Sequence, residues 1–161
     1  MEEVGLMQQA ADFYFTAAMK DRGNAEALAS LQRAGQWVLN DKISRFEQAH
    51  SMGDRSNAVR AYEEALQYVE RVNSAGIQLL ILESAQQAFE QVRNEHLEDL
   101  YEQGLKALEN ENFKDAQNIF DEIIRLDPDY SDALKWSKIS FCEPRYRQAI
   151  DHLEKENWRS A

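Results

Sequence analysis

The sequence predicts an all-α protein built as an array of antiparallel helix pairs, and three observations support this fold class. The 161 residues include only six Gly and two Pro, so few positions interrupt a helix. Ala, Glu, Gln and Leu are abundant, and they lose little side-chain freedom in a helix. Alternating runs of Val, Ile and Thr are missing, which disfavours a sheet. With 43% apolar residues, we expect one helical domain over residues 1–161.

Nine helical segments follow from the apolar spacing and from the residues that start or stop helices. Gly23, Gly53 and Gly76 mark three ends, and Asn24 is the expected N-cap of the second segment. The segments cover about residues 3–21, 24–38, 41–51, 55–73, 78–93, 96–109, 112–126, 131–142 and 145–156. They form pairs over about 3–38, 39–73, 78–93 and 97–126, followed by an incomplete repeat over 131–161. The junctions at 39–41 and 93–95 hold no Gly or Pro, so each allows a turn or a continuous helix.

The clearest unit is residues 97–130, which read LEDLYEQGLKALENENFKDAQNIFDEIIRLDPDY. Apolar residues recur at helical spacing on both sides of the polar break at residues 109–112. This unit resembles the tetratricopeptide repeat, which has a period of 34 residues. Its Gly104, Ala116 and Pro128 match that family, as do Phe120 and Ile123 in character. Three other signature positions hold Leu100, Gln103 and Ala107, where the family usually has Trp, Leu and Tyr. The resemblance implies a right-handed superhelical array, or α-solenoid, with small residues where the helices cross.

The second-helix core of this unit recurs along the chain as a small residue, an apolar one four later and a small or apolar one three further. The copies are Ala27, Leu31 and Ala34, then Ala58, Tyr62 and Ala65, then Ala85, Phe89 and Val92, before Ala116, Phe120 and Ile123. They are separated by 31, 27 and 31 residues. We therefore expect these positions to form the cores of successive helix pairs.

The C-terminal residues 146–161, YRQAIDHLEKENWRSA, align without a gap with residues 101–116, YEQGLKALENENFKDA. This echo is similar to bacterial tetratricopeptide-like proteins with long first helices, with Pro144 expected to interrupt the long helix here. His152 aligns with Ala107, so we expect it to be partly buried. The echo stops at the opening of a second helix, which predicts that the chain is a piece of a longer protein.

The net charge of −11 disfavours nucleic acid and anionic membranes as partners. Residues 97–130 hold ten acidic and three basic residues, a net of −7, whereas residues 131–161 hold five and six, a net of +1. Such charge is typical of a solvated helix face, and it also suits a basic partner. The absence of a long apolar run or a signal peptide favours a soluble, cytoplasmic protein and leaves a periplasmic or envelope site open.

The sequence holds no pattern that predicts catalysis, a cofactor or a metal. The three His residues lack metal-ligand spacing, and no HExxH, CxxC or phosphate-binding Gly-rich loop is present. Cys142 is the only cysteine, which excludes an internal disulfide, and no His lies near it in the sequence to activate it. We therefore expect a protein that is not an enzyme.

The resemblance also implies a concave groove lined by first helices. Its expected partner-binding residues are Asn40, Ile43, Glu47, His50, Glu98, Tyr101, Leu105 and Leu108. This lining is apolar and acidic, and it lacks the Lys and Arg with which the family grips a C-terminal carboxylate. A basic or amphipathic segment, extended or helical, fits it better.

These observations predict a non-catalytic scaffold that binds a protein or peptide in its groove. One alternative is self-assembly, in which the acidic 97–130 surface meets the more basic C-terminus head to tail. Another is a regulatory or recruiting domain of a larger enzyme.

Overall fold

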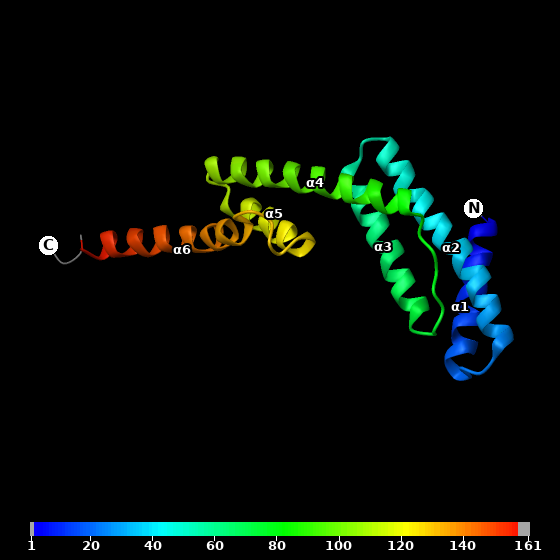
Figure 1. Ribbon diagram of the computed structural model, residues 1–161. Coiled ribbons are helices and arrows are strands. Elements are labelled where there is room, and N and C mark those ends of the chain that lie inside the picture. Colours follow the sequence, from blue (N-terminus) through cyan, green and yellow to red (C-terminus); the bar gives the residue numbers. More distant parts are fainter. Residues whose placement is uncertain (1, 158–161) are drawn as a thin grey trace. The chain divides into compact units, whose positions relative to one another are not determined.

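The computed structural model describes residues 2–157, with side chains described for residues 5–155. It confirms an all-α protein whose six helices pack mostly as sequential antiparallel pairs. The helices are α1 (Glu2–Lys20), α2 (Ala25–Ser51), α3 (Arg55–Asn73), α4 (Glu83–Glu109), α5 (Phe113–Leu126) and α6 (Ala133–Asn157) (Figure 1). The chain forms two compact units, residues 1–94 and 95–161, and α4 contributes to both.

Two side-chain caps set the helix starts of the first unit. The Asn24 side chain accepts a hydrogen bond from the Ala27 amide at 3.0 Å, which confirms Asn24 as the N-cap of α2. Asp54 caps α3 in the same way through the Asn57 amide at 3.1 Å. The hydrogen bonds of the Asn57 side chain and amide lower the pKa of Asp54. Both caps therefore satisfy backbone donors that the first turn leaves unpaired.

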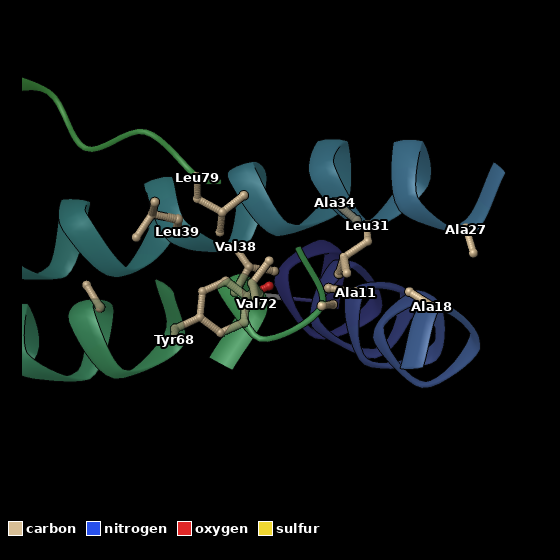
Figure 2. Close-up of a cluster of buried hydrophobic side chains, with 12 residues drawn as sticks. Ala11, Ala18, Ala27, Leu31, Ala34, Val38, Leu39, Tyr68, Val72 and Leu79 are labelled. Carbon is tan, nitrogen blue, oxygen red and sulfur yellow. The ribbon is translucent and has the colours of Figure 1, made fainter. Parts of the chain in front are cut away.

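The core of the first unit is formed mainly by small and branched side chains of α1, α2 and α3. Its buried members include Ala11, Ala18, Ala27, Leu31, Ala34, Val38, Leu39, Ala65, Tyr68 and Val72 (Figure 2). The Tyr68 hydroxyl group is buried and has no hydrogen-bond partner among the described residues. Burial and the nearby Asp12 carboxylate raise the pKa of Tyr68 to about 12.

Residues 77–82 were expected to begin a helix at residue 78, and this prediction was wrong. Gly76 has a φ of +84°, after which the chain runs extended until α4 begins at Glu83. Leu79 is buried beside Val38 and Leu39 of α2 (Figure 2), and Ile77 and Ile81 pack against the same core. Leu80 and Leu82 are exposed, so burial alternates with the period of two that an extended chain imposes.

The second unit is built from the later part of α4, α5 and α6. Its buried side chains are Leu97 of α4, Ala116, Phe120 and Ile123 of α5, and Ala133 of α6. The Ser137 hydroxyl group of α6 also donates a hydrogen bond to the Asp121 carboxylate of α5 at 2.6 Å. All three helices thus share one core.

Two junctions that the sequence left open are continuous helix, because α2 runs through residues 39–41 and α4 through residues 93–95. The expected interruption at Pro144 was wrong, since α6 also continues through it. Proline removes one backbone donor and crowds the preceding turn. Flanking side chains hold this turn: Arg145 Nη1 donates to the Phe141 carbonyl at 2.5 Å and Arg147 Nε to Glu143 at 2.9 Å.

Candidate protein-binding surface

The predicted groove residues of the first unit lie along the second half of α2. The side-chain oxygen of Asn40 accepts a hydrogen bond from Gln36 Nε2 at 3.0 Å. Ile43 is half-buried against the core. Glu47 is exposed, and His50 stacks on Phe46 with ring centroids 6.0 Å apart. Only part of this predicted lining is therefore free to meet a ligand.

Gln36 is a contact residue that the sequence analysis missed. Its Nε2 donates to the Leu80 carbonyl at 2.8 Å, and its Oε1 accepts from the Leu80 amide at 2.9 Å. The side-chain amide thus forms the same pair of hydrogen bonds with the Leu80 backbone that a neighbouring β-strand would form. No pattern along α2 distinguishes this glutamine from the other polar positions, so this contact could not be predicted from the sequence.

The predicted groove residues of the second unit mostly belong to its core. Tyr101, Leu105 and Leu108 pack against the buried cluster, and Glu98 is exposed. The Tyr101 hydroxyl group accepts a hydrogen bond from Trp136 Nε1 of α6 at 3.1 Å. Three of these four side chains are consequently engaged within the unit.

The predicted repeat positions lie in the interior, with one exception. Buried positions are Ala27, Leu31, Ala34, Ala58, Tyr62, Ala65, Ala85, Phe89, Val92, Gly104, Ala116 and Phe120, whereas Pro128 is exposed. In the first unit, Tyr62 stacks on Phe89 with ring centroids 4.0 Å apart. In the second, a Cβ at Gly104 would lie 2.7 Å from Phe120 Cζ, so the helices approach closely there.

Arg147 links α6 to the turn before α5 and to the start of α5. Its guanidinium lies 2.8 Å from the Glu111 carboxylate in the turn before α5 and 5.0 Å from the Phe113 ring centroid. The hydrogen bonds that Arg147 donates to Glu143 and Glu111 raise the pKa of Arg147. From residue 144 to residue 155 every side chain of α6 is exposed. This half of the helix extends past α5 (Figure 1).

Three apolar side chains form one face of this exposed half-helix, here called the α6 face. Tyr146, Ile150 and Leu153 are 63%, 37% and 58% exposed. Their i, i+4, i+7 spacing places them on one side of the helix. His152, expected to be partly buried, is exposed because nothing described covers this part of α6.

The described residues offer little that could perform chemistry. Among the side chains that the structure describes, residues 5–155, no group of three or more His, Cys, Asp or Glu could hold a metal ion. Cys142 is an exposed free thiol. Among the described helices, none combines the length and the apolar character that a membrane span requires. Among the described features, the exposed apolar face of α6 is thus the best candidate for a functional surface.

No family model, curated protein or solved structure matches this chain. The likeness to tetratricopeptide repeats therefore stands on the residues themselves.

Proposed function

We propose that this chain is a non-catalytic protein-binding scaffold of tetratricopeptide-like helix pairs, and that it binds an amphipathic protein segment. The observation that carries the proposal is the α6 face. Its three apolar side chains lie in water, although exposing such a face is unfavourable unless something binds it. The predicted groove residues of the second unit support its core, so the α6 face is the better contact surface.

A selection from a random peptide library, with the intact chain as bait, tests this function. The counter-selection uses the variant Ile150→Asp with Leu153→Asp, which destroys the α6 face at exposed positions. The matched control is Gln148→Asp with His152→Asp, which adds two acidic groups elsewhere on the same exposed helix. We expect enriched peptides that bind the wild type and the control but not the face variant. Enrichment of no peptide with this dependence would overturn the proposal.

Self-association is a second candidate, and the order of charges along α6 favours it. Arg145 and Arg147 flank Tyr146 at the start of the α6 face, whereas Asp151 and Glu154 lie beside Ile150 and Leu153 at its end. Two copies packed antiparallel would place opposite charges beside each other. Light scattering at low and high salt separates the two candidates. A salt-sensitive dimer that Leu153→Asp dissociates supports self-association, and a monomer at both salts rules it out.

A further inference from the structure

The α6 face has a covered counterpart within the same chain. Residues 146–161 and 101–116 are identical at seven of 16 aligned positions. Tyr146, Ile150 and Leu153 of the face correspond to Tyr101, Leu105 and Leu108 of α4, which are the side chains on the same register of the earlier helix. The earlier copy therefore shows what this pattern of side chains binds when it is covered.

In the earlier copy α5 covers this face, together with Trp136 of α6, which contacts Tyr101. Ala116, Phe120 and Ile123 of α5 are each 0% exposed and lie in the cluster that Tyr101, Leu105 and Leu108 pack against. The Tyr101 and Phe120 rings meet edge to face, with centroids 6.0 Å apart. The part that α5 supplies is an amphipathic helix with a small residue, an apolar residue four positions later and another three positions further.

Resting on the proposed function, we propose that the α6 face binds an amphipathic helix of a second polypeptide, in the way that α5 covers α4. The occupant is a helix because the aligned face of α4 packs against a helix, α5. In the first unit, by contrast, an extended segment covers α2 with Ile77, Leu79 and Ile81, which are spaced two residues apart. The partner helix therefore has a small residue, an apolar residue four positions later and another apolar residue three positions further, as in Ala116, Phe120 and Ile123 of α5.

One difference between the two copies sets the specificity of this site. Gly104 lies at the point of closest approach to α5, where a Cβ would come within 2.7 Å of Phe120 Cζ. The corresponding residue of α6 is Ala149, which has that Cβ. If a partner phenylalanine took the place on α6 that Phe120 takes on α4, its ring would collide with the Ala149 Cβ. The partner helix therefore has a smaller aliphatic residue, such as leucine, at that position.

Labelled synthetic peptides and the intact chain test this inference by fluorescence anisotropy. The probes are residues 112–128 of this chain, the same peptide with Phe120→Leu, and the Phe120→Leu peptide with Ile123→Asp. A peptide of residues 76–83 serves as the extended control. We expect the Phe120→Leu peptide to bind about tenfold more tightly than the parent peptide, and the other two to bind more weakly than either.

Two variants of the chain locate the contact. The variant Ile150→Asp with Leu153→Asp should bind the Phe120→Leu peptide about tenfold or more weakly than the wild type does. Ala149→Gly should restore binding of the parent peptide. Binding that survives the first variant would mean that the peptide replaces α5 in its own unit, and would overturn the inference. Equal affinity for the leucine and phenylalanine peptides would overturn the steric rule. If no probe binds while library peptides still depend on the α6 face, the partner helix is wrong and the proposed function survives.

Discussion

Two stretches of this chain carry nearly the same side-chain pattern in opposite environments. Residues 101–109 lie in α4 and pack against α5, so their apolar face supports a core. The aligned residues 146–154 lie in α6, where Tyr146, Ile150 and Leu153 are exposed. Both stretches are helical throughout. The comparison shows that a helix forms from its own residues and flanking turns, whereas burial of its apolar face depends on a second element.

The first unit covers apolar surface by another means. Residues 77–82 run extended over α2, where Leu79 is buried and Gln36 binds the Leu80 backbone. The cost of ordering this segment is offset by three inward side chains and two hydrogen bonds. A helix and an extended strand can therefore both cover an α-helical face, and the spacing of the covering side chains distinguishes them.

The largest expected effect comes from a substitution in α5, which covers the 101–109 stretch of α4. Phe120→Ala should lower the free energy of unfolding of the second unit by about 3–5 kcal/mol, because it removes a fully buried ring. Urea unfolding followed by Trp136 fluorescence, in a background with Trp37→Phe and Trp158→Phe, measures it. Leu153→Ala, on the exposed half of α6, should change the free energy of unfolding by less than about 0.5 kcal/mol. A large effect of Leu153→Ala would mean that the α6 face is already covered in solution.

The sequence predicted the helices well where the reason is local. The N-cap at Asn24 was correct because a side chain and a nearby amide decide it. The prediction that a helix begins at residue 78 was wrong, because a short apolar run fits a helix and an extended segment equally well. The hydrogen bonds with Gln36 favour the extended form. The α6 face could not be recognised as exposed, since the same pattern is buried in α4.

The second expected effect concerns the point where a helix approaches its cover. Gly104→Ala should cost about 1–2 kcal/mol, because the collision with Phe120 outweighs the better helix propensity of alanine. Ala149→Gly should also cost about 1 kcal/mol, for the propensity alone. Thus glycine is preferred at one aligned position and alanine at the other. Adding Phe120→Leu should reduce the cost of Gly104→Ala, and strictly additive free energies would contradict the close approach.

A smaller effect sharpens the contrast between the helical and the extended cover. Gln36→Ala should destabilise the first unit by about 1 kcal/mol, since it removes two hydrogen bonds that water partly replaces. Amide hydrogen exchange should show faster exchange at Leu80 in this variant than in the wild type. Gln32→Ala, at an exposed position one turn earlier in α2, is the control and should leave that amide unchanged. Unchanged exchange at Leu80 in Gln36→Ala would show that packing alone holds the segment.

The smallest effect isolates a single hydroxyl group in the two copies. Tyr101→Phe keeps the ring against Phe120 but removes the acceptor of the Trp136 indole N–H, which is 3.1 Å away. The expected loss is about 0.5–1 kcal/mol, seen as a shift of the urea midpoint with an unchanged slope. Tyr146→Phe at the aligned position should leave the midpoint unchanged, because that side chain is 63% exposed. Addition of the Phe120→Leu peptide should not alter this difference, since a bound helix would cover the Tyr146 ring without supplying an indole. If Tyr146→Phe instead shifts the midpoint as Tyr101→Phe does, its hydroxyl group has a buried partner, and the two copies are covered alike.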